Sequence, residues 1–201
     1  MGFSNSSALL KTLIIFSLTV LAGCSHNIQV NPDLTELRQT KINSLSPHNV
    51  AYFISKEDKE RQVTTPGGGG DKVSYKPYSD TEGALNTILS RIFSRVYSMK
   101  SLDDSDFIKD KKISYIFIPK LSTNSSSSSA LTWPPTEFLM SLNCTAIDSD
   151  GIRIWEKTVH AKGYAEFSEF KADFSLSARR ASENAFKMML EEINNEQLFT
   201  N

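Results

Sequence analysis

One stretch of alternating apolar and polar residues, between residues 138 and 146, constrains the fold of this chain most strongly. Its apolar or small side chains fall at every second position: Phe138, Met140, Leu142, Cys144 and Ala146. Successive side chains of a strand point to opposite faces of a sheet, so these residues share one face and the residues between them share the other. The sequence therefore predicts a strand over 136–147 with one buried face. On that face Cys144 is a small buried hydrophobe rather than a reactive or metal-binding thiol.

The residues that follow this strand have the chemistry of a β-hairpin. The run Asp148-Ser149-Asp150-Gly151 is typical of a tight turn, and residues 152–167 supply an antiparallel return strand. Two further stretches, 49–55 and 113–121, are rich in β-branched and aromatic residues and predict strands.

Four consecutive glycines, Gly67 to Gly70, raise the question of a phosphate-binding loop. The pattern G-x-x-x-x-G-K-[ST] needs a glycine directly before its lysine. Asp71 occupies that place here, where a carboxylate would repel a polyphosphate, and Val73 replaces the magnesium-binding hydroxyl. We therefore expect no nucleotide site. The glycines are interpreted as a flexible turn before an edge strand over 72–78, which Pro77 restricts because it cannot donate a ladder hydrogen bond.

Two helices are predicted from apolar side chains that recur every three or four residues. The first spans 80–99 and begins with a capping box formed by Ser79 and Glu82. The second spans 173–195 and has an alanine-rich apolar face, which would let it approach a sheet closely. The serine-rich stretch 122–132 predicts a mobile loop. Together these elements predict the α+β class: a single α/β sandwich, with a mainly antiparallel sheet and two helices packed on one face.

The first 24 residues have the features of an export signal. A single basic residue, Lys11, precedes an apolar run from Leu13 to Ala22 that is too short to span a bilayer as a mature helix. The run ends in Leu21-Ala22-Gly23-Cys24, which resembles the bacterial lipobox. The resemblance implies that residues 1–23 are a lipoprotein signal peptide that is removed, and that Cys24 then carries three acyl chains, palmitate among them.

Two alternatives exist for this N-terminus. One is an ordinary signal peptide with a chance cysteine, and the other is the loose N-myristoylation pattern at Met1–Ser6, which would leave the apolar run unexplained. Acyl chains on Cys24 would hold the protein on a membrane without a transmembrane helix, because each buried methylene contributes about 0.8 kcal/mol. Ser25 stands where lipoproteins retained at the inner membrane usually carry Asp, so the resemblance implies the outer membrane.

The expected organisation has three parts. Residues 1–23 are the signal peptide, residues 24–47 are the lipidated N-terminus with a polar tether, and residues 48–197 form one periplasmic α+β domain. A tether of this length would let the domain stand off the bilayer.

The charge balance excludes two classes of partner. The full chain has 22 basic and 23 acidic residues, and removal of the signal peptide takes away one basic residue, Lys11. Nucleic acids and anionic membrane surfaces are bound by strongly basic faces. We therefore expect no nucleic acid as a partner and no polybasic patch on a membrane, in addition to the absence of a nucleotide expected from the glycine stretch. With Cys24 acylated, Cys144 has no disulfide partner.

No recognised catalytic motif occurs in the chain. The patterns G-x-S-x-G, H-E-x-x-H and C-x-x-C are absent, and the three histidines show no metal-ligand spacing. Three aspartates lie close together: Asp103, Asp104 and Asp106. They lack the bending glycine and the terminal glutamate of an EF-hand loop and are interpreted as a solvated connection. We therefore expect no enzyme, no metal and no cofactor.

Aromatic residues near the last helix are the candidates for contact with a partner. Phe167, Phe170 and Phe174 recur across the junction between the last strand and this helix, with packing in the core as the alternative. Trp155 shares its strand parity with two basic residues, which predicts a place on the polar face. There it would contact a partner or cover a second small cluster. The predicted partner-binding residues are Trp155, Phe167 and Phe170.

The order of these features resembles the small outer-membrane lipoproteins of the YajG type. The stretches "PGGGGDKVSYKPY", "TWPPTEF" and "AEFSEFKADFSLSARRASENA" also resemble an uncharacterised group of proteobacterial periplasmic lipoproteins. The resemblance implies fold and location, and it carries over no functional residue except Cys24. We expect a lipid-anchored, periplasm-facing, non-catalytic binding or assembly module for an envelope protein complex. The alternatives are a small-molecule or lipid-binding auxiliary of an envelope transport system and, third, a hydrolase of envelope material.

Overall fold

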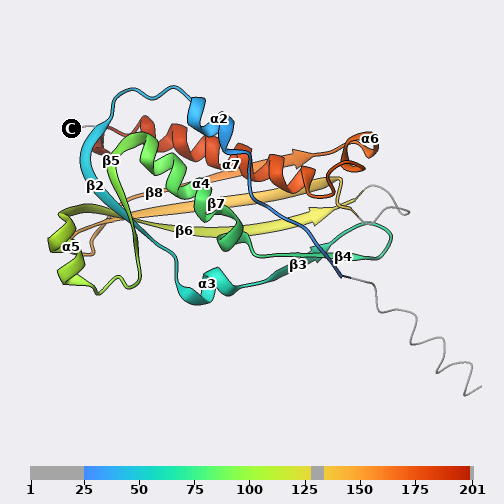
Figure 1. Ribbon diagram of the computed structural model, residues 1–201, viewed down its shortest axis with the longest axis horizontal. Helices are drawn as coiled ribbons and strands as arrows, with labels where there is room; N and C mark the ends of the chain where they lie inside the picture. The colour runs from blue at the N-terminus through green and yellow to red at the C-terminus, as the bar shows by residue number, and fades with distance from the viewer. Residues whose placement is uncertain (1–24, 128–133, 200–201) are drawn as a thin grey trace, which may run out of the picture.

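A five-stranded sheet forms the body of the protein, which the computed structural model describes over residues 25–127 and 134–199 (Figure 1). Its strands lie in the order β5-β2-β6-β7-β8. Their bounds are β2 Ser46–Phe53, β5 Phe93–Met99, β6 Ile113–Ser126, β7 Glu137–Asp148 and β8 Arg153–Tyr164. β2 pairs in parallel with β5 and β6, whereas β7 pairs antiparallel with β6 and β8. The sheet is thus mixed, where the sequence predicts a mainly antiparallel one.

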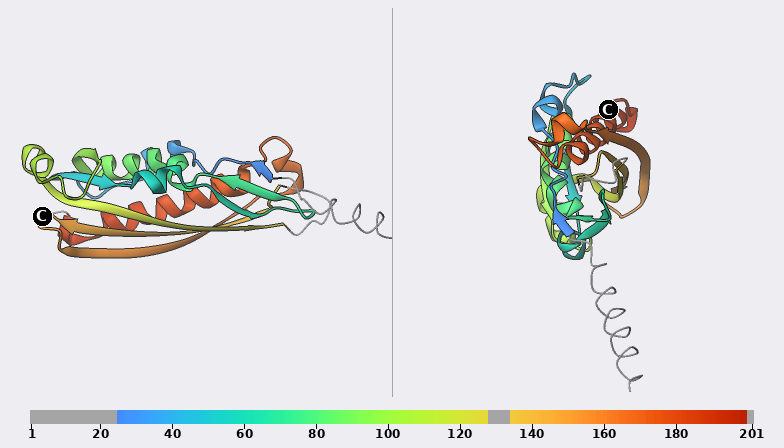
Figure 2. Two further views of the ribbon diagram at one scale, coloured as in Figure 1. Left: turned by 90° about the horizontal axis from the view of Figure 1, so that it is seen from below. Right: turned by 90° about the vertical axis from the view of Figure 1, so that its right-hand side faces the viewer.

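Two helices cover one face of this sheet, as the sequence predicts. α4 (Pro77–Ile92) and α7 (Leu176–Asn194) lie side by side over it (Figure 2), and the short α2 (Leu34–Gln39) packs against both. The core between helices and sheet holds fully buried aromatic side chains: Phe93, Phe117, Phe138, Phe186 and Phe199. Burial of apolar surface stabilises such a core by about 25 cal/mol per Å². The α+β class is therefore confirmed.

The predicted hairpin is formed by β7 and β8. Gly151 in its turn has a φ of 80°, which glycine adopts without strain. The alternating apolar residues of β7 are buried against the helices, and Cys144 among them is fully buried. Burial raises the pKa of the Cys144 thiol to about 12. Because the thiolate is the form that attacks substrates and binds metals, Cys144 is a packing residue, as predicted.

The start of α4 differs from the predicted capping box. The helix begins at Pro77, whose missing N–H suits the first turn, and the preceding Lys76 makes no capping hydrogen bond through its side chain. Glu82 does not reach back to the helix start. Its carboxylate accepts hydrogen bonds from Tyr52 Oη (3.1 Å) and Lys59 Nζ (2.7 Å), the latter in the short helix α3 (Lys56–Glu60).

The end of α4 is earlier than predicted, because residues 93–99 form β5 instead of the last helical turns. Phe93 packs into the core under the helices, whereas Met99 packs into a second apolar cluster on the opposite face of the sheet. Val96 and Tyr97, next to each other in β5, are partly buried on opposite faces, so the apolar residues of the strand do not alternate regularly with polar ones. A short apolar run without alternation cannot be distinguished from a helix by its period.

The N-terminal segment folds onto the domain, where the sequence predicts a polar tether over 24–47. β1 (Ser25–Asn27) belongs to a second, three-stranded sheet in the order β1-β4-β3, with β4 (Lys72–Tyr75) and β3 (Val63–Pro66). Three apolar side chains of the segment are buried: Ile28, Val30 and Leu37. The tether prediction fails here because single, irregularly spaced apolar residues hold the segment to the core, and they give no periodic signal.

The serine-rich stretch also differs from its prediction in its first part. β6 continues through residues 122–126, which pair with β7, and Ser125 is buried. Ser125 Oγ lies 2.5 Å from Thr65 Oγ1 and 2.5 Å from the Pro66 carbonyl oxygen, so its hydroxyl is satisfied between β6 and β3 of the second sheet. Residues 128–132 of the predicted loop lie outside the described residues.

The four glycines form the turn of the β3–β4 hairpin. The N–H of Gly67 donates to the carbonyl of Asp71 (2.9 Å), and the N–H of Asp71 donates to the carbonyl of Gly68 (3.1 Å). Gly69 and Gly70 have φ values of 65° and 86°, which residues with a Cβ rarely adopt. The predicted turn is confirmed, and two of its positions need glycine for their backbone conformation.

Candidate functional site

The face of the sheet away from α4 and α7 carries a second, smaller apolar cluster. Its buried members are Ala51, Met99, Ile113 and Ile116. The helix α5 (Ser105–Lys111) covers part of it with Phe107 and Ile108. Asp104 caps this helix, since its Oδ1 accepts a hydrogen bond from the N–H of Phe107 at 3.0 Å. Part of the predicted acidic connection therefore starts a helix.

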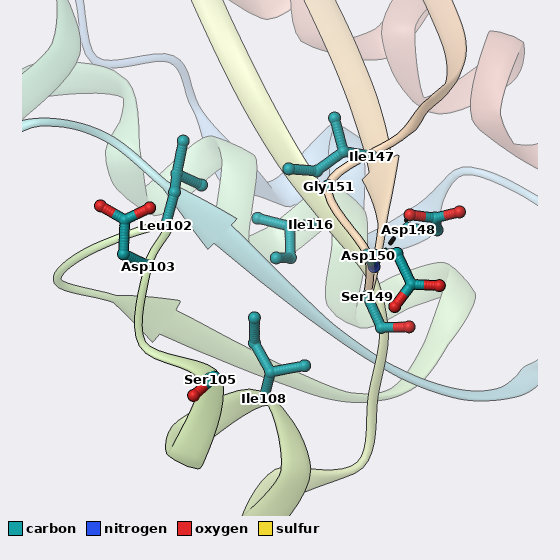
Figure 3. A pocket seen from close by; sticks show the side chains of 10 residues that line it. All are labelled: Leu102, Asp103, Ser105, Ile108, Ile116, Ile147, Asp148, Ser149, Asp150 and Gly151. Atoms are coloured by element: carbon teal, nitrogen blue, oxygen red, sulfur yellow. Dashed lines mark hydrogen bonds between the residues drawn. The ribbon is translucent and has the colours of Figure 1, made fainter.

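A pocket of about 360 Å³ opens between α5 and the β7–β8 turn (Figure 3). We call it the α5 pocket. Its apolar side chains come from four separate segments of the chain: Leu102, Ile108, Ile116 and Ile147. Its acidic residues are Asp103, Asp148 and Asp150, and none of the residues that line it is basic. The α5 pocket thus combines an apolar floor with a negatively charged rim.

The geometry of the rim leaves two carboxylates available to a ligand. Asp148 Oδ1 accepts hydrogen bonds from the N–H groups of Asp150 (3.0 Å) and Ile152 (2.9 Å), which fixes the turn. Within the described residues, the carboxylates of Asp103 and Asp150 make no hydrogen bond or ion pair. Figure 3 shows Asp103 on one side of the pocket and Asp150 on the other.

The side chains that line the α5 pocket carry apolar, hydroxyl or carboxylate groups. In residues 25–127 and 134–199 no group of three or more His, Cys, Asp or Glu side chains is arranged to hold a metal ion. An apolar floor with an acidic rim suits a group that carries an apolar body next to a positive charge, as an aliphatic side chain beside Lys or Arg does.

Trp155, a predicted contact residue, lies in the core. It is 7% exposed, and its ring meets those of Phe117 and Phe199 with centroids 6.4 and 5.5 Å apart. Phe199 belongs to the terminal turn η2 (Gln197–Phe199). A side chain in this position packs the interior and does not contact a partner.

A bulge explains why the parity argument fails for Trp155. In the register of β7 with β8, Trp155 lies opposite Ala146 and Arg153 lies opposite Ile147, which leaves Ile154 unpaired. The extra residue reverses the alternation, so Arg153 and Trp155 lie on opposite faces of the sheet. Lys157 does share the face of Trp155, opposite Cys144, but this face is the one under the helices, and the Lys157 ammonium pairs there with Glu192 of α7 at 3.4 Å.

The three phenylalanines at the β8–α7 junction have different environments. Phe170, in α6 (Phe167–Phe170), is 4% exposed, whereas Phe167 is 54% and Phe174 is 46% exposed. Packing in the core, the alternative interpretation, therefore holds for Phe170. Phe167 stays a candidate for contact with a partner. Phe174, at the same junction, is also exposed and becomes a second candidate for such contact.

The predicted lipidation residue, Cys24, lies outside the described residues, and its acylation stays a prediction. Among the residues that are described, no helix is both long enough and apolar enough to cross a membrane.

No protein-family model matches the sequence, and a search of curated proteins gives no match. Among solved structures, the chain is similar to protein XCC0632 from Xanthomonas campestris, at 12% identity, 89% coverage of this chain, 96% of that chain and a TM-score of 0.41. A homolog of a neuraminyllactose-binding hemagglutinin from Helicobacter pylori has 15% identity, coverages of 80% and 90%, and a TM-score of 0.43. A protein described as a lipoprotein from Caulobacter crescentus has 13% identity, coverages of 72% and 87%, and a TM-score of 0.33. With TM-scores this low, these likenesses assign the chain to no family and no activity, and the resemblance to YajG-type lipoproteins stays a prediction.

Proposed function

We propose that the protein is a lipid-anchored lipoprotein of the outer membrane that faces the periplasm and acts as a non-catalytic binding or assembly module for an envelope protein complex. The export signal and the lipobox-like sequence at Cys24 support the anchor. The α5 pocket is the observation that carries the binding role, because it pairs an apolar floor with two carboxylates that have no partner in the described residues. Its occupant is a segment of an envelope protein that presents Lys or Arg beside an aliphatic side chain.

The apolar floor and the acidic rim of the α5 pocket make different contributions to binding. Burial of an aliphatic side chain on the floor supplies affinity at about 25 cal/mol per Å². Asp103 and Asp150 lie at the exposed rim, where a pair with an incoming cation contributes up to about 1 kcal/mol. Charges at a rim mainly select the partner and speed its approach, so the carboxylates give specificity.

The double substitution Asp103→Asn and Asp150→Asn tests this role. It removes both charges, keeps the size of the side chains, and leaves the turn-forming Asp148 in place. We expect partner binding to weaken about tenfold, because two rim pairs together contribute on the order of 1.4 kcal/mol. The measurement is recovery of the partner in a pull-down from membranes after mild crosslinking.

A matched control removes the same charge elsewhere. Glu57→Gln and Glu191→Gln, at exposed positions on α3 and α7, should leave recovery of the partner unchanged. Equal recovery with the Asp103/Asp150 variant and with this control would exclude the α5 pocket as the binding site.

A second candidate function is a small-molecule or lipid-binding auxiliary of an envelope transport system. The volume of the α5 pocket favours it, since about 360 Å³ falls within the range of small-ligand sites, about 300–1,000 Å³. Native mass spectrometry of the detergent-purified protein separates the two candidates. A bound small molecule beyond the acyl chains of Cys24, lost in the Asp103/Asp150 variant, would favour the auxiliary over the assembly module.

A further inference from the structure

The chain enters the folded domain without a linker. Ser25 is the first residue of β1, and Cys24 precedes it directly. Consecutive Cα atoms are about 3.8 Å apart, so a lipid on Cys24 is attached at the edge of the domain itself. β1 is held in place by pairing with β4, by Ser25 Oγ at 2.6 Å from Ser74 Oγ, and by His26 Nε2 at 3.0 Å from Asp71 Oδ2. With a lipid on Cys24, the surface around β1 lies next to the membrane.

Figures 1 and 2 show which elements share that end of the long axis with β1. They are the β3–β4 turn and α6, whereas α5 lies at the opposite end. A hydrogen bond ties the N-terminal segment to the residues after α6, since the N–H of Gln29 donates to Ser175 Oγ at 3.0 Å. The anchor and the exposed phenylalanines of the junction thus lie at the same end of the protein.

Phe167 is held at the surface by contacts of α6 with the rest of the domain. The ring of Phe167 stands edge to face on the buried Phe170, with centroids 5.2 Å apart. Arg180 donates to both carboxylate oxygens of Glu169 (2.8 and 3.0 Å), which fixes α6 against α7, and these hydrogen bonds lower the pKa of Glu169 to about 2. Two large apolar side chains exposed on one short segment indicate a surface that another molecule covers in the functional state.

The charges around these phenylalanines are balanced. Arg180 pairs with Glu169, and Arg179 pairs with Asp173 at 2.8 Å. Lys171 lies over the ring of Phe167, with its Nζ 4.7 Å from the centroid. A surface of this kind enters the boundary between headgroups and acyl chains through its aromatic rings, with one cation near the phosphates, and does not depend on anionic lipid.

We propose that this end of the protein rests on the bilayer that holds the lipid of Cys24, with Phe167 and Phe174 inserted at the headgroup–acyl boundary. The inference depends on the lipid anchor put forward under Proposed function. It assigns Phe167 to lipid rather than to a protein partner. It also directs the α5 pocket away from the membrane, toward the periplasm.

A fluorescent reporter at position 167 tests whether this end of the protein contacts the bilayer. Phe167→Cys is labelled with nitrobenzoxadiazole in the full lipidated protein, which is then incorporated in vesicles of phosphatidylethanolamine and phosphatidylglycerol. Cys144 is fully buried and takes no label. We expect the emission at 167 to shift to shorter wavelength and to be quenched by spin-labelled lipids. The matched control is Ile152→Cys, 62% exposed at the opposite end, whose emission should stay that of a probe in water.

Each outcome separates the inference from the function on which it rests. If the protein does not float with the vesicles, the lipid anchor itself is wrong. If the protein floats and the probe at 167 behaves like the probe at 152, the proposed contact of this end with the bilayer is wrong and the anchor stands. A probe at 167 that is shielded from water but not quenched by the spin-labelled lipids would assign the α6 surface to a protein contact. That result would also contradict the proposed contact with the bilayer.

Discussion

Gly163→Ala should destabilise the protein by about 3 kcal/mol, since forcing atoms into a packed interior costs about 1–3 kcal/mol or more. A Cβ at position 163 would overlap the carbonyl oxygen of Ser177 and the backbone nitrogen of Ala181. Both atoms belong to the backbone of α7, so no side-chain rotation relieves the overlap and the helix has to move off β8. Urea unfolding followed by circular dichroism measures the loss.

Gly83→Ala is the matched control. Gly83 is exposed on α4, and a Cβ there meets no atom within 4 Å. Alanine is the better helix former, so this substitution should stabilise the protein by about 0.5–1 kcal/mol. Opposite signs for the two substitutions confirm the close approach of β8 to α7. A neutral Gly163→Ala would contradict it.

Trp155→Ala should lower the free energy of unfolding by about 3–5 kcal/mol, the range for removing a large aromatic side chain from a core. The indole is 7% exposed and contacts the rings of Phe117 and Phe199, which would border the cavity. Differential scanning calorimetry or urea unfolding measures this loss. The control is Ile152→Ala in the adjacent turn, 62% exposed, which should change stability by less than about 0.5 kcal/mol.

This prediction separates packing from partner contact at Trp155. If Trp155 were a contact residue, its removal would reduce binding and leave the unfolding midpoint in place. A Trp155→Ala variant with an unchanged unfolding midpoint would therefore indicate that Trp155 lies at the surface. A lowered midpoint means that any loss of binding in the same variant reflects unfolding.

The parts of the fold that the sequence predicts are those with a complete local pattern. Every second residue of β7 from Phe138 to Ala146 is buried, and the turn that follows ends in a glycine with positive φ. The apolar face of α7 is buried from Ala178 to Ile193, and its alanines permit the close approach to Gly163. In these elements the local period and the global packing agree.

The parts that were mispredicted depend on contacts between distant segments. Apolar residues of β5 pack on both faces of the sheet, Val96 on one and Tyr97 on the other, so they imitate the continuation of a helix. Residues 25–39 fold through scattered buried side chains, such as Val30 and Leu37, without a periodic face. The bulge at Ile154 places Arg153 and Trp155 on opposite faces of the sheet, and only the register with β7 reveals it.

The α5 pocket was missed for the same reason. Its apolar floor comes from four segments, and its acidic residues come from two separate loops, so no local motif joins them. A weak signal did exist. Asp104 precedes Phe107 and Ile108 by three and four residues, which is the pattern of a capped helix with one apolar side. Identification of that helix would have placed Asp103 beside the sheet rather than in a solvated connection.

The membrane contact of the α6 end and the orientation of the α5 pocket toward the periplasm both depend on a lipid on Cys24. The intact mass of the protein, extracted in detergent from membranes, tests it most directly. The account predicts a chain that begins at Cys24 and carries the added mass of a diacylglyceryl group and one further acyl chain. A chain that begins at Met1, or at any residue other than Cys24, without added lipid mass would contradict it.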